Sequence, residues 1–355
     1  MKALITAGGR GTRLRPITHT QNKHLIPVAN KPILFYALEY VKAAGITDVG
    51  MVINAGTTEV QDVLGDGSPW GVSITYIPQD RPLGLAHVVK ISEEFIGDDE
   101  FVFYLGDNIV VGGISRFIEE FRTAESNCHL VLARVKDPER FGVPEIIENR
   151  IVRIEEKPKV PKSNYAVSGI YIYGPHIFEA VNSISPSDRG ELEISDAHQY
   201  LVEKGYHISF SEITGWWKDT GKPLDLLEAN RLILDNLPSN YVDQSIDKNS
   251  TLLGRARIAP SARIINSNIR GPVIIGENCR IENTYVGPYT SIYNNTVIRN
   301  SEVEYSIILD SCRIEDVDLR IESSLLGKEA EIVKATPKPR THRFVIGNQS
   351  RVEIR

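Results

Sequence analysis

The clearest indication of how the first part of the chain folds comes from residues 2–11, KALITAGGRG. Its apolar run, Lys2–Thr6, has the length of a buried strand and leads into a glycine-rich turn. Apolar residues at helical spacing follow between Lys31 and Ala44, and Gly45 is the predicted stop. Further buried strands are predicted over residues 49–53, 72–77 and 101–105, with helical stretches between them. Alternating strands and helices favour an α/β fold.

The predicted architecture of this part is Rossmann-like, with a mostly parallel sheet and helices on both faces. Ligands of such sheets bind beyond the carboxyl ends of the strands. We therefore expect the glycine-rich loop after the first strand and Asp107, which follows the strand at 101–105, to lie at one edge.

The sequence changes character near Leu237-Pro238. Branched apolar residues then return about every six positions, with slips near Asn266 and Asn300. This period is typical of hexapeptide turns, so residues 238–355 are predicted to form a left-handed parallel β-helix after a catalytic domain at 1–237. A boundary there also predicts that removing 238–355 changes association but leaves the active-site residues in place. Apolar corners of the repeat are Ile258, Ile264, Ile275, Ile281, Val286, Ile292 and Ile298.

The composition limits the class of protein. With 41% hydrophobic and 24% charged residues, the chain has the make-up of an ordinary globular protein. A net charge of −6 argues against general nucleic-acid binding, and no apolar run is long enough to predict a membrane span. Three well-separated cysteines and no recognisable signal peptide favour a reducing, cytoplasmic location. Residues 1–38 contain no Asp or Glu but six Lys or Arg, which indicates a small polyanion site.

The segment AGGRGTRLRP, residues 7–16, is the leading chemical motif. It is not a P-loop, because no GK[ST] ends it. Glycines after a strand nevertheless let backbone N–H groups approach phosphate oxygens, and Arg13 can add fork-shaped donors. A purely structural tight turn is the alternative that this segment alone leaves open.

Several motifs together resemble one family. GGxGTRLxPxT at 8–18 is followed by KxLxPVxxKP at 23–32, and the chain is similar in both to the sugar-nucleotide pyrophosphorylases. Together with the β-helix tail, the whole chain resembles the long form of the glucose-1-phosphate thymidylyltransferases. Later segments in the family's order are Gln79 with PLGLA at 82–86, LGDN at 105–108, FGV at 141–143, EEKP at 155–158, GELEISD at 190–196 and WWKDTG at 216–221.

The resemblance implies that the phosphate of glucose-1-phosphate attacks the α-phosphorus of dTTP and releases pyrophosphate. A phosphate monoester is already ionised near neutral pH, so the chemistry needs charge neutralisation rather than a general base. By resemblance, Asp107 and Asp219 bind one Mg²⁺, while Arg13, Lys23 and Lys157 hold the phosphates.

Substrate contacts are also implied by the resemblance. The nucleotide contacts are Gly8, Gly9, Gly11, Thr12, His24, Gln79, Gly84 and Asp107, and the sugar-phosphate contacts are Gly142, Glu156, Lys157 and Val167. Gln79 would bond the pyrimidine edge. His24 departs from the family pattern, in which many members carry Gln after the reactive Lys. Thymine and uracil differ by one methyl group, so UTP remains an alternative to dTTP.

Other functions stay open at this point. The chain could use another sugar phosphate, or could be a non-catalytic regulatory subunit that binds nucleotide sugars. β-Helices also occur in acyltransferases that use a His base, and here the β-helix region contains only His342. We expect instead that this region supports a homo-oligomer.

Overall fold

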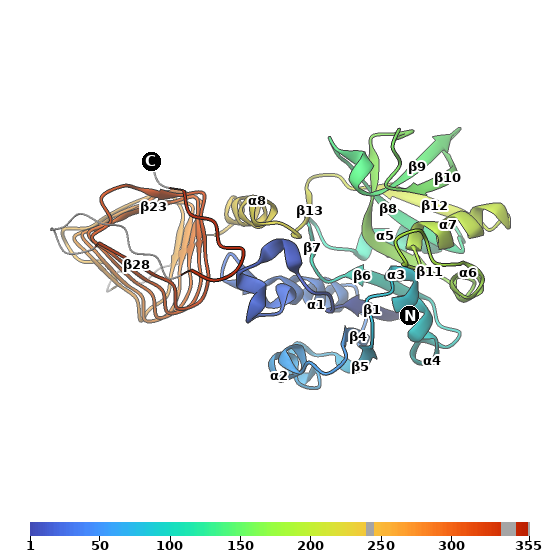
Figure 1. Ribbon diagram of the computed structural model, residues 1–355, viewed down its shortest axis with the longest axis horizontal. Helices are drawn as coiled ribbons and strands as arrows, with labels where there is room; N and C mark the ends of the chain where they lie inside the picture. The colour runs from blue at the N-terminus through green and yellow to red at the C-terminus, as the bar shows by residue number, and fades with distance from the viewer. Residues whose placement is uncertain (239–244, 335–345, 354–355) are drawn as a thin grey trace. The chain divides into compact units, whose positions relative to one another are not determined.

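The computed structural model describes residues 1–238, 245–334 and 346–353 (Figure 1). Their contacts group into two compact units. The first holds residues 1–10 and 33–219, and the second holds 11–32 and 220–355. The predicted boundary at 237 stays a prediction, but this grouping places the loop 11–32 with the C-terminal part. His342 lies outside the described residues.

A seven-stranded mixed sheet forms the centre of the first unit. Four neighbouring strands of this sheet run parallel, and the strand Tyr165–Tyr173 runs antiparallel to the strands on both of its sides. The predicted strands of this unit are confirmed, with Lys2–Thr6 and Phe101–Leu105 at the expected bounds. The sheet order is β12 (Ile208–Glu212), β8 (Cys128–Arg134), β11 (Tyr165–Tyr173), β6 (Phe101–Leu105), β1 (Lys2–Thr6), β4 (Asp48–Asn54) and β5 (Ser73–Gln79).

Helices cover both faces of this sheet, as predicted. Leu130 of β8 packs in a cluster with apolar residues of the helices Leu85–Ile91, Ile177–Ser183 and Ile194–Glu203. The preceding residue, His129, points to the opposite face, where its Nε2 lies 2.7 Å from Ser211 Oγ. The Ser211 hydroxyl donates to Glu120 of the helix Ser115–Thr123, which covers this face. Helices of the unit are α1 (Ile33–Ala43), α2 (Glu59–Leu64), α3 (Leu85–Ile91), α4 (Glu93–Ile96), α5 (Ser115–Thr123), α6 (Ile177–Ser183) and α7 (Ile194–Glu203).

Two small antiparallel pairs extend the first unit. β7 (Asn108–Val110) pairs with β13 (Trp217–Asp219), and β9 (Gly142–Ile147) pairs with β10 (Arg150–Glu156). Each pair ends at a residue that the sequence predicts to be functional.

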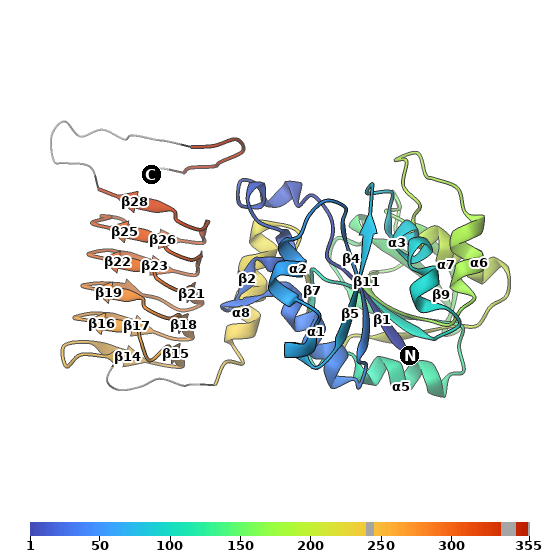
Figure 2. The same ribbon diagram turned by 90° about the horizontal axis from the view of Figure 1, so that it is seen from below.

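The second unit contains the predicted left-handed parallel β-helix, whose coils stack in Figure 2. Apolar corners such as Ile264, Ile281 and Ile298 are buried on top of one another. One sheet has β14 (Thr251–Leu253), β17 (Asn268–Arg270), β20 (Tyr285–Val286), β23 (Glu302–Glu304) and β26 (Ile321–Glu322). The next has β15 (Ala256–Ile258), β18 (Val273–Ile275), β21 (Thr290–Ile292), β24 (Ile307–Ile308) and β27 (Leu325–Leu326), and the third has β16 (Arg263–Ile265), β19 (Arg280–Glu282), β22 (Val297–Arg299), β25 (Arg313–Glu315) and β28 (Glu331–Val333).

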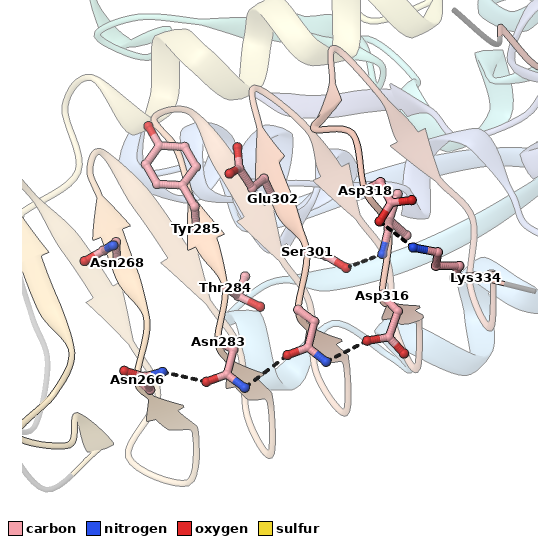
Figure 3. A pocket seen from close by; sticks show the side chains of 12 residues that line it. Asn266, Asn268, Asn283, Thr284, Tyr285, Ser301, Glu302, Asp316, Asp318 and Lys334 are labelled. Atoms are coloured by element: carbon pink, nitrogen blue, oxygen red, sulfur yellow. Dashed lines mark hydrogen bonds and ion pairs between the residues drawn. The ribbon is translucent and has the colours of Figure 1, made fainter. Parts of the chain in front are cut away.

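A ladder of hydrogen-bonded side chains marks the positions at which the six-residue period slips. Asn266 donates to Asn283, Asn283 to Asn300 and Asn300 to Asp316, along one corner of the stack (Figure 3). The first two steps each span 17 residues rather than three sixes. All four residues take a positive φ, a conformation that Asn and Asp tolerate better than most residues. The slips near Asn266 and Asn300 are therefore the tight corners of the coil.

A helix and a hairpin complete the second unit. α8 (Pro223–Leu234) and the pair β2 (Pro27–Val28) and β3 (Lys31–Pro32) lie against the coils. A small apolar cluster joins them, in which Ala29, Leu234 and Ile274 are buried together.

Two general findings bear on the expectations from composition. No described helix is long and apolar enough to cross a membrane. The cysteines Cys128, Cys279 and Cys312 are all buried as free thiols, and burial raises the pKa of the Cys279 thiol to about 12.

We predict that Ile281→Ala lowers the free energy of unfolding by about 2–5 kcal/mol, because it opens a cavity in the β-helix core. Ile281 is fully buried, whereas Leu253 of the same unit is 58% exposed. Urea unfolding followed by far-ultraviolet circular dichroism measures the change. Leu253→Ala removes as many carbon atoms and should change stability by less than about 0.5 kcal/mol. Equal losses in the two variants would contradict this account of the core.

Candidate active site

The carboxyl edge of the parallel strands begins with the loop Gly8-Gly9. Asn54, the last residue of β4, binds this loop: its Oδ1 accepts from Gly9 N at 2.9 Å, and its Nδ2 donates to Gly9 O at 3.4 Å. A Cβ on Gly8 would lie 3.0 Å from the same Oδ1. The absence of side chains at these glycines thus allows Asn54 to bond to the backbone of the loop. The predicted contacts of Gly8 and Gly9 with a nucleotide remain predictions.

Gln79 ends the next strand and lies opposite Asn54 in the register of β4 and β5. Its Nε2 is 3.0 Å from Nδ1 of His87 on α3. Burial, followed by the charge of Lys90, lowers the pKa of His87. A neutral imidazole can accept the amide N–H through Nδ1, which leaves the Gln79 carbonyl oxygen available to another donor.

Gly84 precedes α3 with a φ of 99°. A Cβ at this position would lie 2.4 Å from the carbonyl oxygen of Leu192. The structure therefore gives Gly84 a packing reason for lacking a side chain, beside its predicted contact with the nucleotide.

The two predicted metal ligands are brought to one place by the pairing of β7 and β13. Asp219 pairs with Asn108, the residue that follows Asp107 in the sequence. Asn108 Nδ2 donates to Asp107 Oδ1 at 3.1 Å, and the indole of Trp217 donates to Asn108 Oδ1 at 2.7 Å.

A hydrogen bond from the preceding strand also fixes the backbone next to Asp107. The buried hydroxyl of Tyr104 donates to Asn108 O at 2.9 Å. Burial raises the pKa of Tyr104 well above its ordinary value, so the hydroxyl remains a donor. No group of three or more metal-ligating side chains occurs among the described residues, so a cation here would complete its shell with water or substrate oxygens.

Gly142 and Glu156 are paired residues at one end of the β9–β10 hairpin. Ser195, near the start of α7, donates to Glu156 Oε2 at 2.8 Å. A Cβ on Gly142 would lie 2.6 Å from Ser195 Oγ, so only glycine leaves this hydrogen bond intact. The predicted sugar-binding carboxylate is therefore held in a fixed orientation.

Two cations flank the same carboxylate. Lys157 Nζ lies 3.2 Å from Glu156 Oε1, and Arg189 lies 3.5 Å from it. Lys157 also takes a φ of 46°, with its backbone N–H bonded to Phe141 O. Val167 is buried in β11, where the register with β8 shifts before Tyr171.

The remaining predicted phosphate ligands belong to the second unit. Thr12 and Arg13 lie in the short 3₁₀ turn Thr12–Leu14, which Gly11 precedes with a φ of 55°. A Cβ on Gly11 would lie 3.2 Å from the Cβ of Lys23. The absent side chain thus lets the turn that carries Arg13 and the turn that carries Lys23, residues 23–25, pack together.

His24 is fully buried beside Lys23. Asn22 Oδ1 accepts from the backbone N–H of His24 at 2.9 Å and lies 3.0 Å from its Nδ1. The imidazole therefore donates through Nδ1 and stabilises the turn that carries Lys23. The predicted contact of His24 with the nucleotide stays a prediction.

Sequence reasoning missed the residues that support the site. Asn54 could have been found, since it is a polar residue at the end of a predicted parallel strand. The bonds of Ser195 and Arg189 to Glu156 join segments more than 30 residues apart, and no local pattern shows them.

Comparisons with known proteins place these features in a family. Residues 2–236 match the family model described as Nucleotidyl transferase. Over 355 residues the chain is 48% identical to the glucose-1-phosphate thymidylyltransferase of Streptomyces griseus, covering 100% of this chain and 99% of the relative. It is 44% identical over 359 residues to the low-salt glycan biosynthesis nucleotidyltransferase Agl11 of Haloferax volcanii, with 100% of each covered. A crystal structure of a Bacillus anthracis protein with sucrose is 42% identical, with a TM-score of 0.63 over 69% of this chain and 98% of that one.

We predict that His87 titrates below its ordinary pKa of about 6.5, so that it is neutral at pH 7 and takes up a proton only in more acidic solution. Gln79→Glu would place a carboxylate in the position of the amide and raise the pKa of His87 by about 1–3 units. Proton NMR of the imidazole signals measures both values, and His87→Gln identifies the signal by its loss. A pKa of His87 that Gln79→Glu leaves unchanged would contradict the contact.

Proposed function

We propose that this chain, which belongs to the nucleotidyl transferase family, is a glucose-1-phosphate thymidylyltransferase. It converts dTTP and glucose-1-phosphate to dTDP-glucose and pyrophosphate. The observation that supports this most is the identity of 48% over the full length to a thymidylyltransferase. The geometry agrees with a metal-assisted phosphoryl reaction, because Asp219 lies beside Asp107 at the carboxyl edge of the sheet.

The reaction is an in-line substitution at phosphorus. An oxygen of the sugar phosphate forms a bond to the α-phosphorus, and the bond from that phosphorus to the bridging oxygen breaks. The electron pair leaves with pyrophosphate, so no proton has to be removed from the nucleophile. The two reactants are both anions, and the protein lowers the barrier by balancing their charge.

The residues of this chain divide that task. Asp107 and Asp219 would hold Mg²⁺, which supplies charge neutralisation at the phosphates when bound. Lys23 would contact the α-phosphate and the sugar phosphate, Arg13 the leaving pyrophosphate, and Lys157 the sugar phosphate. Long cationic side chains suit these roles because phosphates need several donors at once.

The two substrate ends are recognised by fixed polar groups. Gln79, held by His87, would bond the edge of the pyrimidine. Glu156, held by Ser195, would accept from a sugar hydroxyl. The complete set of phosphate-binding side chains favours catalysis over a purely regulatory, nucleotide-sugar-binding role. Homo-oligomer formation and a cytoplasmic location stay predictions.

Pyrophosphate release with glucose-1-phosphate and Mg²⁺ tests the proposal. The assay compares dTTP with UTP and the purine triphosphates, and we expect the highest kcat/KM with dTTP. A preference for UTP would keep the reaction type and change the substrate. Release with none of these triphosphates would contradict the proposed function.

We predict that Asp107→Asn or Asp219→Asn lowers kcat by about a hundredfold or more, because each removes a negative ligand of the metal ion. Raising the Mg²⁺ concentration should recover part of the loss. Steady-state rates over a Mg²⁺ titration check both points. Asp98→Asn, at an exposed position, is the matched control and should retain the wild-type rate. Wild-type rates in either site variant would exclude that residue as a metal ligand.

A further inference from the structure

The outer surface of one β-helix sheet is buried in three successive coils. Arg257, Ile274, Ser291 and Ile307 are successive register partners in β15, β18, β21 and β24. Arg257 is exposed, whereas the other three are 6%, 0% and 1% exposed. Outward side chains of an uncovered coil would meet solvent. Here α8 and the β2–β3 hairpin both bond to the coil that contains Ser291. Ile274 packs in a cluster with Ala29 of the hairpin turn and Leu234 of α8.

One buried amide on α8 joins the three elements. Asn230 is fully buried, and its Oδ1 accepts from Ala29 N at 2.8 Å and from Ser291 Oγ at 2.6 Å. Its Nδ2 donates to Tyr289 O at 2.9 Å. A buried amide with this many partners fixes helix, hairpin and coil against one another, because every displacement leaves a buried polar group unpaired.

A second amide clamps the turn of the hairpin itself. Ala29 and Asn30 have φ values of 48° and 57°, the signs of a type I′ turn, in which Asn is favoured. Asn30 Nδ2 donates to Ile292 O at 2.7 Å, at the end of β21.

The clamped hairpin is the direct continuation of the phosphate-binding loop. Lys23 lies in the turn 23–25, and β2 begins at Pro27. Earlier in the loop, Ile17 approaches Gly327, whose added Cβ would lie 3.6 Å away. The loop therefore passes close to the coils at Ile17 and bonds to them through the hairpin that follows it.

We propose that Asn30 and Asn230 are positioning residues that hold Lys23 in place for the reaction. The β-helix is then part of the active-site scaffold, and this inference rests on the proposed function. It also counts against the expectation that removing 238–355 leaves the active-site residues in place. A cation that must stabilise charge in the transition state is sensitive to its position, and a displacement of about 1 Å can cost as much as a hundredfold in rate.

Asn30→Gly tests the proposal in the full-length protein. Glycine adopts a positive φ without strain, so the substitution removes the bond to Ile292 O and little else. We expect kcat to fall by about tenfold, with KM for both substrates within about twofold of wild type and an almost unchanged Tm. The matched control is Asn295→Gly: Asn295 has a φ of 58° and donates to Asp310 at an exposed corner. This control should retain wild-type kcat and KM.

A double-mutant cycle separates positioning from a general structural role. If Asn30 acts through Lys23, Asn30→Gly should change the residual rate of a Lys23→Ala protein by less than about twofold. The same tenfold loss in both backgrounds would overturn the inference, as would a wild-type kcat in Asn30→Gly. A wild-type protein that releases no pyrophosphate would instead contradict the proposed function itself.

Discussion

The parallel pairing of β1 with its neighbours is the constraint on which the candidate site depends. Thr6 lies beside Val52 on one side and Leu105 on the other, so the three strands end at one edge. β5 continues the edge by pairing residue for residue with β4. Segments that are about a hundred residues apart in the sequence therefore deliver glycine, amide and carboxylate groups to the same line. One edge of the sheet thus holds residues that the sequence predicts to contact the nucleotide and the metal ion.

The parts of the fold that follow local patterns could be predicted from the sequence. Apolar runs marked β1 and β6 at their observed bounds, and helical spacing marked α1, because burial on one face imposes these periods. The resemblance to a known family points to Asp107 and Asp219. The pairing of β7 with β13, which brings their backbones close together, joins segments more than a hundred residues apart. The supporting bonds of Asn54 and Ser195 have the same origin. Which side chains meet across such distances depends on the finished packing.

The C-terminal region shows the same limit in another form. The recurrence of branched residues predicted the stacked coils, since each coil must bury its corners against the next. The six-residue period did not reveal the coil length, because Asn283 and Asn300, which occupy equivalent corners with left-handed backbones, are 17 residues apart. One feature of the sequence indicates that part of the outer sheet surface is covered: Arg257 is replaced by Ile274 at the equivalent position of the next coil. No sequence pattern identifies the covering segment, a hairpin that lies more than 200 residues earlier in the chain.

The Asn ladder repeats the same contact from coil to coil, whereas, among the described residues, Asn230 bonds to one coil alone, the coil that contains Tyr289 and Ser291. Each repeat of a solenoid contacts only its neighbours. Here the coil with Tyr289 and Ser291 packs against its neighbours in the stack, and it also bonds to Asn230, which holds the hairpin that follows Lys23. Substitutions should therefore accumulate in the outer coils during evolution while this coil diverges slowly. An engineer who lengthens or shortens the stack would have to leave this coil in place.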